Sequence, residues 1–219
     1  MNKFVEAFPE QLEAALAIGQ TFAWQPDPGS FQQVLLSGLG GSGIGGSIVQ
    51  EYLSDKCALP FFVNKDYAIP RWVNAQTLFI ACSYSGDTEE TLQAVALAKK
   101  QKATIVCITS GGLLEQYAHR HQLPLILIPG GMPPRSCIGY ALVQVLFVLK
   151  RAGLLRTAFE KEIAATAREL KLAQKQIQKK AKTIASKLYG KIPVIYTPAS
   201  HEGLAIRFRQ QLNENSKVL

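Results

Sequence analysis

The sequence predicts an α/β protein built on a doubly wound, flavodoxin-like parallel sheet with helices on both faces. Short, continuously apolar runs alternate with longer amphipathic stretches, as expected for strands that are buried on both faces. Glycine-rich or hydroxyl-rich turns follow several of these runs, where a strand would end and a helix begin. In such a sheet, ligands bind at the carboxyl ends of the strands, near the point where the strand order reverses.

Five buried strands are expected in the first part of the chain. They correspond to the segments QQVLLSG (32–38), LPFFVNK (59–65), QTLFIACS (76–83), ATIVCIT (103–109) and LPLILIP (123–129). Helical segments separate or follow them, notably SIVQEYLSD (47–55), TEETLQAVALAKKQ (88–101) and CIGYALVQVLFVLKRAG (137–153). The alternation of strand and helix predicts parallel pairing.

The remainder of the chain predicts a long helix and the start of a second unit. Apolar residues recur at steps of three, four or seven over 157–190, which indicates one apolar stripe on a helix. The segment KIPVIYTP (191–198) is predicted to be a strand, and a helix is expected to follow it. One strand and one helix cannot bury their apolar faces alone. We therefore expect a first domain over 1–153, a basic connecting helix over 154–190, and over 191–219 the beginning of a second α/β domain in a truncated chain.

The net charge of +8 is concentrated in one segment. Between Arg151 and Lys191, eleven Lys or Arg residues stand against three Glu, an excess that equals the charge of the whole chain. We interpret these cations as the solvated faces of the long helix. A nucleic-acid-binding stripe is the alternative, but no aromatic residues are interleaved as stacking platforms, so no nucleic-acid partner is expected.

Composition also limits the compartment and the metal chemistry. No apolar run approaches the roughly 20 residues that span a bilayer, and the acidic N-terminal segment does not resemble a signal peptide. A cytoplasmic protein without a membrane partner is expected. The cysteines lie far apart in the sequence and are expected to be free thiols. His119 and His121 are not part of a group of cysteines and carboxylates in the sequence that would suggest a metal site.

The loop over 38–46, GLGGSGIGG, follows the first predicted strand and satisfies the G-x-G-x-x-G pattern twice. One interpretation is a dinucleotide site, for which Asp66 is a late candidate to hold the ribose. That interpretation leaves Ser42 and the hydroxyl residues after the third strand unexplained. A loop so poor in side chains indicates close approach of a ligand or of another backbone segment.

Ser83, Ser85 and Thr88 lie at the end of the third predicted strand, where a helix begins. Backbone amides and the positive end of a helix dipole are available at the same point. Hydroxyls and amides together can donate hydrogen bonds to a phosphate without Lys or Arg. The alternative is that a single side chain of this turn, Ser85 or Asp87, caps the helix. Capping accounts for one residue and leaves the others unexplained.

Four segments carry a family resemblance: GLGGSGIGGS, CSYSGDTEET, GGMPPRSCIGY and LNENSK. Together, and in this order, they resemble the sugar isomerase (SIS) fold, and in particular the bifunctional phosphoglucose/phosphomannose isomerases. The resemblance implies that Ser42, Ser83, Ser85 and Thr88 hold the phosphate of a hexose 6-phosphate. Gly40 and Gly41 would let the sugar approach the backbone.

The resemblance also assigns chemistry to two residues. Arg135 would stabilise an enediolate near C1 and C2 of the sugar, and Glu214 would be the base that moves a proton between these carbons. The alternatives are a surface arginine at the start of a helix and a solvated helical glutamate. The family's ring-opening histidine and a lysine near its C-terminus have no counterpart in a chain that ends at Leu219.

The implied activity is interconversion of glucose 6-phosphate, and also mannose 6-phosphate, with fructose 6-phosphate. It requires no metal or organic cofactor, because protein groups transfer the proton, and the resemblance implies a homodimer with sites between subunits. Two alternatives stay open: a non-catalytic phosphosugar sensor that binds DNA, and an isomerase or synthase of amino-sugar phosphates. The LNENSK segment argues against the second.

Overall fold

The computed structural model describes residues 1–27 and 29–217 and contains the predicted parallel sheet. Its strand order is β2-β1-β3-β4-β5, and every neighbouring pair is parallel. The order reverses between β1 and β3, so the sheet is doubly wound, as predicted. The strands are β1 (Gln33–Ser37), β2 (Phe61–Asn64), β3 (Thr77–Ser83), β4 (Thr104–Thr109) and β5 (Leu125–Leu127).

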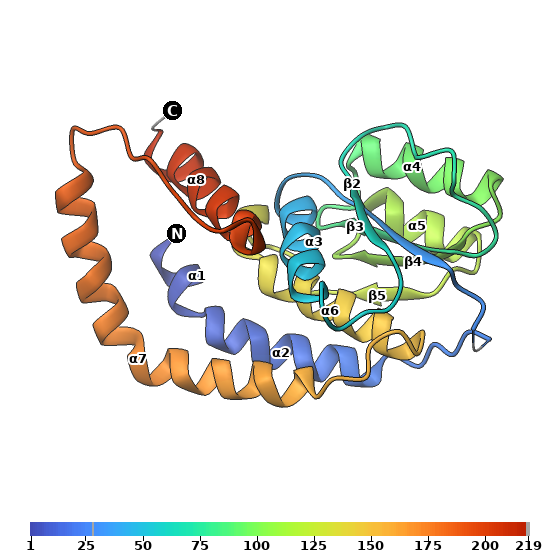
Figure 1. Cartoon of the computed structure of the whole chain (residues 1–219), viewed down its shortest axis with the longest axis horizontal. Helices are drawn as coiled ribbons and strands as arrows, with labels where there is room; N and C mark the ends of the chain where they lie inside the picture. Colours follow the sequence, from blue (N-terminus) through green and yellow to red (C-terminus); the bar gives the residue numbers. More distant parts are fainter. Residues whose placement is uncertain (28, 218–219) are drawn as a thin grey trace.

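Eight α-helices and two 3-10 helices accompany the sheet in the described part of the chain. The α-helices are α1 (Asn2–Glu6), α2 (Phe8–Thr21), α3 (Gly40–Tyr52), α4 (Glu89–Lys100), α5 (Gly112–Arg120), α6 (Ile138–Arg151), α7 (Phe159–Leu188) and α8 (Glu202–Ser216). The 3-10 helices are η1 (Pro134–Ser136) and η2 (Ala199–His201). Figure 1 shows α4 and α5 on one side of the sheet and α3 and α6 on the other, with α2 packed beyond α6.

The central strand β3 shows why the apolar runs are continuous rather than alternating. All seven of its residues are buried. Leu78 and Ile80 belong to the core formed with α2, α3 and α6, whereas Phe79 and Ala81 belong to the core formed with α4 and α5. Successive side chains of a strand point to opposite faces, so a strand covered on both faces is apolar at every position.

The first part of the long helix α7 is packed against the first domain rather than standing free as a connector. Phe159 and Ala167 are buried, and the ring of Phe159 lies 5.1 Å from that of Phe147 in α6. In Figure 1, α7 runs along α2 and then turns away from it. In the C-terminal half of α7, apolar side chains are more exposed: Ile177 and Ile184 are about half exposed.

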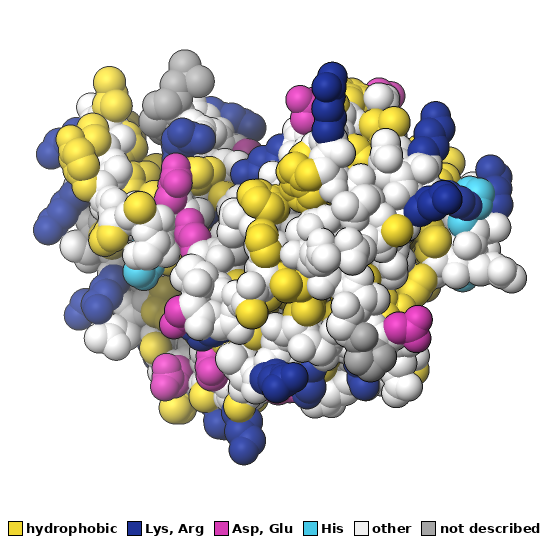
Figure 2. All heavy atoms as spheres, turned by 45° about the vertical axis from the view of Figure 1, so that its right-hand side comes forward, with side chains coloured by type: hydrophobic (Ala, Val, Ile, Leu, Met, Phe, Trp, Pro, Cys, Tyr) yellow, Lys and Arg dark blue, Asp and Glu magenta, His cyan; other side chains and the backbone are white. Residues whose placement is uncertain are grey.

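Cationic side chains lie in separate groups in the space-filling view rather than in one continuous surface. In Figure 2, Lys and Arg are interrupted by acidic, apolar and uncharged side chains. Among the described residues, no helix is both long and apolar enough to cross a membrane.

The prediction of a strand over 191–198 is wrong for the described structure, in which these residues form neither strand nor helix. Ile192, Val194 and Tyr196 are 83%, 69% and 91% exposed. A strand exists only by hydrogen bonding to a neighbour, and the described residues provide no neighbouring strand for this segment. Its apolar composition therefore does not suffice to give it sheet structure.

Candidate active site

A hollow of about 230 Å³ opens at the carboxyl ends of β1 and β3, where the strand order reverses. Its lining consists of Leu39, Gly40, Gly41, Ser42, Tyr84, Ser85, Thr88 and Pro134. The hollow is smaller than the roughly 300–1,000 Å³ of most pockets for drug-sized ligands. It suits a phosphate group and the carbons next to it better than a dinucleotide.

The glycine loop forms the start of α3 on one side of this hollow. Leu39 is the N-cap residue, and no side chain caps the helix. Within the described residues, the amides of Gly40 and Gly41 have no hydrogen-bond acceptor, as expected for the first turn of a helix. Gly40 has a φ of +53°, and a side chain there would meet nothing within 4 Å. These amides therefore remain available to an anion.

Gly41 has a different reason for being glycine. A Cβ atom at this position would lie 3.1 Å from the carbonyl oxygen of Pro134. The loop that carries Arg135 thus packs directly against the glycine loop, and the close approach involves protein backbone. A Cβ at Gly38 would likewise lie 2.8 Å from the carbonyl oxygen of Cys82 in β3.

The serine turn, defined here as residues 83–88, forms the opposite wall. The hydroxyl oxygens of Ser83 and Thr88 are 2.8 Å apart, and the Ser83 oxygen also accepts a hydrogen bond from the Gly86 amide at 3.1 Å. Ser83 is 2% exposed and does not line the hollow. Because the Ser83 oxygen is already an acceptor, its proton can go to Thr88, which leaves the Thr88 proton free for a ligand.

None of the three hydroxyls caps α4. Its N-cap residue is Thr88, and no side chain makes a capping hydrogen bond there. The Ser85 hydroxyl oxygen accepts a hydrogen bond from the Asp87 amide at 3.2 Å within the turn itself. The first amides of α4 therefore lack acceptors among the described residues, so two uncapped helix N-termini, of α3 and α4, meet at the hollow.

Asp87 supports the turn from behind. Its carboxylate accepts a hydrogen bond from the Leu113 amide, 2.9 Å away in the first turn of α5. Gly86 has a φ of +79°, and a Cβ there would lie 1.8 Å from the carbonyl oxygen of Gly111. The serine turn is thus fixed in shape by the loop that follows β4.

Ser42 completes the lining and lies beside a buried thiol. Its side chain is 8% exposed and contacts Cys82. Burial raises the pKa of the Cys82 thiol to about 11, so this thiol is neutral at physiological pH. The thiol behind Ser42 therefore adds no negative charge next to the hollow.

Arg135 and Glu214 are brought together from distant parts of the sequence. The Arg135 Nε lies 3.9 Å from a carboxylate oxygen of Glu214 and donates a hydrogen bond to the Asn215 side-chain oxygen at 3.1 Å. Arg207 donates to the backbone carbonyl of Arg135. Neither Arg135 nor Glu214 lines the hollow itself, but Pro134, the neighbour of Arg135, does.

Helix α8 reaches this position by docking on α3. The Gly203 amide donates a hydrogen bond to the Glu51 carboxylate. A Cβ at Gly203 would lie 3.1 Å from Ile48. The family resemblance gave no role to Tyr84, Arg207 or Asn215, although Tyr84 and Asn215 lie inside the segments that carry it.

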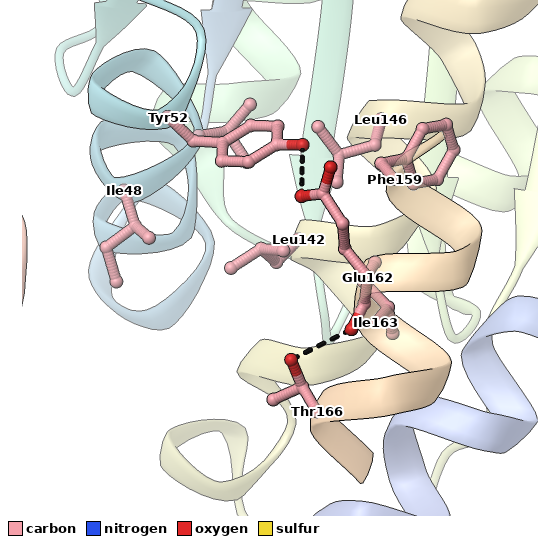
Figure 3. Close-up of a pocket in the computed structure, with 9 residues that line it drawn as sticks. Ile48, Tyr52, Leu142, Leu146, Phe159, Glu162, Ile163 and Thr166 are labelled. Carbon is pink, nitrogen blue, oxygen red and sulfur yellow. Dashed lines mark hydrogen bonds between the residues drawn. The ribbon is translucent and has the colours of Figure 1, made fainter. Parts of the chain in front are cut away.

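A second hollow, of about 240 Å³, lies between α3, α6 and α7 (Figure 3). Its walls are mainly apolar, and the Tyr52 hydroxyl donates a hydrogen bond to the Glu162 carboxylate at 2.9 Å. Burial is the main cause that raises the pKa of Tyr52. This hollow has no set of polar groups that converge on a ligand. The described residues also contain no group of three or more potential metal ligands.

Comparison with known proteins identifies the family of this chain. Residues 31–124 match the SIS domain family, and residues 177–219 match the family described as the bacterial phospho-glucose isomerase C-terminal SIS domain. A bifunctional phosphoglucose/phosphomannose isomerase from Caldicellulosiruptor bescii is 36% identical over 99% of this chain and 66% of its own length. This chain belongs to the bifunctional phosphoglucose/phosphomannose isomerase family.

A second relative in this family, from Thermoplasma volcanium, is 39% identical over 87% of this chain and 59% of its own length. The chain therefore spans about three fifths to two thirds of these relatives. The crystal structure of tagatose-6-phosphate ketose/aldose isomerase from Escherichia coli shares the fold, with a TM-score of 0.67 and 18% identity. That match covers 97% of this chain and 62% of the other.

Proposed function

We propose that the protein to which this chain belongs is a sugar-phosphate isomerase. It interconverts glucose 6-phosphate, and also mannose 6-phosphate, with fructose 6-phosphate. The observation that carries the proposal is the meeting of two uncapped helix N-termini at a hollow lined by Ser42, Ser85 and Thr88. Free amides, hydroxyl donors and two positive dipole ends together bind a phosphate.

The proton transfer falls to the pair beside this hollow. The Glu214 carboxylate removes the proton from C2 of the open-chain aldose, which gives an enediolate. It returns a proton to C1 while the hydroxyl proton of O2 passes to O1, which gives the ketose. The Arg135 guanidinium stabilises the negative charge on the sugar oxygen during the transfer. Both groups belong to the protein, and the reaction as proposed uses no cofactor.

The domain organisation is part of the same proposal. Residues 1–153 form the first SIS domain, 154–190 the connecting helix, and 191–219 the start of a second SIS domain. The family matches over 31–124 and 177–219 support two SIS units. The second match begins at residue 177, so it includes the C-terminal part of α7 as well as residues 191–219. A homodimer and a cytoplasmic location remain predictions.

Calorimetric titration of the chain with fructose 6-phosphate tests the phosphate site. A Ser85→Ala/Thr88→Val variant removes both hydroxyls of the turn that line the hollow, and we expect its affinity to fall at least about 30-fold, because hydrogen bonds to charged groups contribute most. Ser47→Ala, in α3 but outside the lining, is the matched control and should bind normally. Equal affinity in the double variant, or no binding by the wild-type chain, would refute the proposal for this site.

The two alternative functions have separate signatures. An amino-sugar-phosphate enzyme would bind glucosamine 6-phosphate more tightly than fructose 6-phosphate in the same titration. A phosphosugar sensor that acts on DNA would bind a duplex with an affinity that falls steeply as salt rises.

A further inference from the structure

Tyr84 lies between the two serines of the turn, but its side chain leads elsewhere. The Tyr84 hydroxyl oxygen accepts a hydrogen bond from the Met132 amide at 3.0 Å. Its backbone carbonyl accepts two hydrogen bonds from Ser110, one from the amide at 3.0 Å and one from the hydroxyl at 2.6 Å. The loop after β4 therefore holds the backbone of Tyr84, and the Tyr84 side chain in turn holds the loop that contains Met132.

The loop that it holds is the one that carries Arg135. Met132 precedes Arg135 by three residues in the connection between β5 and α6. The Cys137 thiol lies beside the Tyr84 hydroxyl and donates a hydrogen bond to the Pro133 carbonyl at 3.2 Å. The hydroxyl thus contacts this loop on both sides of Arg135.

The other end of the loop is anchored by a different residue. The buried side-chain amide of Gln11 donates to the Ser136 carbonyl and accepts from the Gly139 amide, each at 2.8 Å. Arg135 consequently lies between two anchors. Of these, only Tyr84 is also part of the wall of the hollow.

We infer that Tyr84 is a positioning residue that couples phosphate binding at the serine turn to the placement of Arg135. This inference rests on the proposed function, because it requires Arg135 to act on the sugar of a bound hexose 6-phosphate. The turn that holds the phosphate also holds the backbone of Tyr84, and the Tyr84 hydroxyl fixes Met132 relative to that turn. The sugar then meets an arginine that is already in place.

The tether does not depend on pH in the physiological range. Burial raises the pKa of Tyr84 to about 12, so the hydroxyl stays neutral and keeps its proton. A neutral phenol oxygen can accept the Met132 amide bond and still donate its proton to the neighbouring thiol.

Amide hydrogen exchange measures the tether directly. Within the described residues, the Tyr84 hydroxyl is the acceptor of the Met132 amide. In Tyr84→Phe, we expect exchange at Met132 to accelerate by about tenfold or more, because this hydrogen bond is lost. Tyr140→Phe is the matched control: Tyr140 is a largely buried tyrosine near the same thiol, and its hydroxyl makes no hydrogen bond in the described structure. Unchanged exchange at Met132 in Tyr84→Phe would overturn the inference.

Comparing the binding of inorganic phosphate with that of fructose 6-phosphate distinguishes an effect on Arg135 from an effect on the phosphate site. In Tyr84→Phe, affinity for inorganic phosphate should stay within about twofold, whereas affinity for fructose 6-phosphate should fall about five- to tenfold, as expected for loss of one hydrogen bond. In an Arg135→Gln background, Tyr84→Phe should cause no further loss, because the residue acts through the arginine.

Failure of the inference and failure of the proposed function give different results. If the wild-type chain binds neither ligand, the proposed phosphate site fails and the coupling fails with it. If the wild-type chain binds both and Tyr84→Phe weakens both equally, the phosphate site stands. Tyr84 is then a part of the anion site, and the coupling to Arg135 is refuted.

Discussion

Arg135 and Glu214 form an ion pair in which the Arg135 Nε lies 3.9 Å from a Glu214 carboxylate oxygen. The same nitrogen donates a hydrogen bond to the side chain of Asn215, which is 80 residues away from Arg135 along the chain. The two side chains are 37% and 45% exposed. An ion pair this accessible contributes little to stability. Removing one partner should therefore cost the fold little, so a chemical role of the pair can be tested separately from stability.

This relationship predicts that Glu214→Gln separates activity from stability. Because the pair is exposed, the free energy of unfolding should change by less than about 1 kcal/mol. Where the wild-type protein isomerises fructose 6-phosphate, the variant should lose roughly 10²- to 10⁴-fold in kcat, as expected for removal of a general base. Glu13→Gln, which breaks the ion pair of Glu13 with Lys171 on α7, is the control and should leave kcat unchanged. Full activity in Glu214→Gln would contradict the assignment.

Gly86→Ala should disrupt the serine turn. The backbone at Gly86 has a φ of +79°, and the new Cβ would lie 1.8 Å from the Gly111 carbonyl oxygen. Backbone strain and overlap together should lower the free energy of unfolding by roughly 2–5 kcal/mol in urea denaturation. Gly153→Ala provides the comparison, because its φ is +73° but nothing lies within 4 Å. It should cost only the backbone term, and similar losses in both variants would disprove the role of close packing.

Gln11→Leu should loosen the anchor of the Arg135 loop. The substitution leaves the Ser136 carbonyl and the Gly139 amide without their side-chain partner. We expect a loss of roughly 2–4 kcal/mol in the free energy of unfolding, because the buried Gly139 amide and the partly buried Ser136 carbonyl both lose a hydrogen bond. Gln144→Leu is the matched case: its amide donates a single hydrogen bond, to the Ala15 carbonyl, and its oxygen has no partner among the described residues. It should cost less, and an equal or larger loss would count against this explanation.

The buried thiols predict a loss of stability at high pH. Burial raises the pKa of Cys82 to about 11 and that of Cys107 to about 12, from 9.0 in the unfolded chain. Above pH 9 the unfolded state therefore releases protons that the folded state retains, and unfolding becomes more favourable as pH rises. Each thiol should contribute about 1.4 kcal/mol per pH unit until its folded-state pKa is reached.

Denaturant titrations at a series of pH values from 8 to about 10.5 measure this dependence, within the range where the linkage holds. Cys107→Ala should reduce the slope by the contribution of one thiol. An identical slope in the variant would show that other groups cause the dependence.

The elements that can be predicted from the sequence are those that depend on neighbouring residues. The run Leu78–Cys82 is apolar at each position because both faces of β3 are covered. The hydroxyl residues after it mark the end of a strand and the start of a helix. Both statements concern residues close together in the chain, and the structure confirms them.

The placement of individual functional groups was less predictable. Ser83 is 2% exposed and its hydroxyl contacts Thr88, so its contact with a phosphate stays a prediction. Gly41 lines the hollow, and a backbone carbonyl of Pro134 also packs against it. The partner of Ser83 lies within the same turn and that of Gly41 lies in the loop before α6, and the sequence pattern indicates neither contact.

The sequence by itself determined the sheet, the succession of strands and helices along the chain, and the glycine and hydroxyl turns at the carboxyl ends of β1 and β3, because apolar periodicity and turn residues act locally. Tertiary structure alone decided that the Tyr84 hydroxyl reaches Met132, that Arg135 meets Glu214, and that residues 191–198 form no strand. Each of these depends on a partner far away in the chain, or on one that is absent from the described residues. Burial and hydrogen bonding are satisfied in space, so their outcome follows from the packed fold rather than from spacing in the sequence.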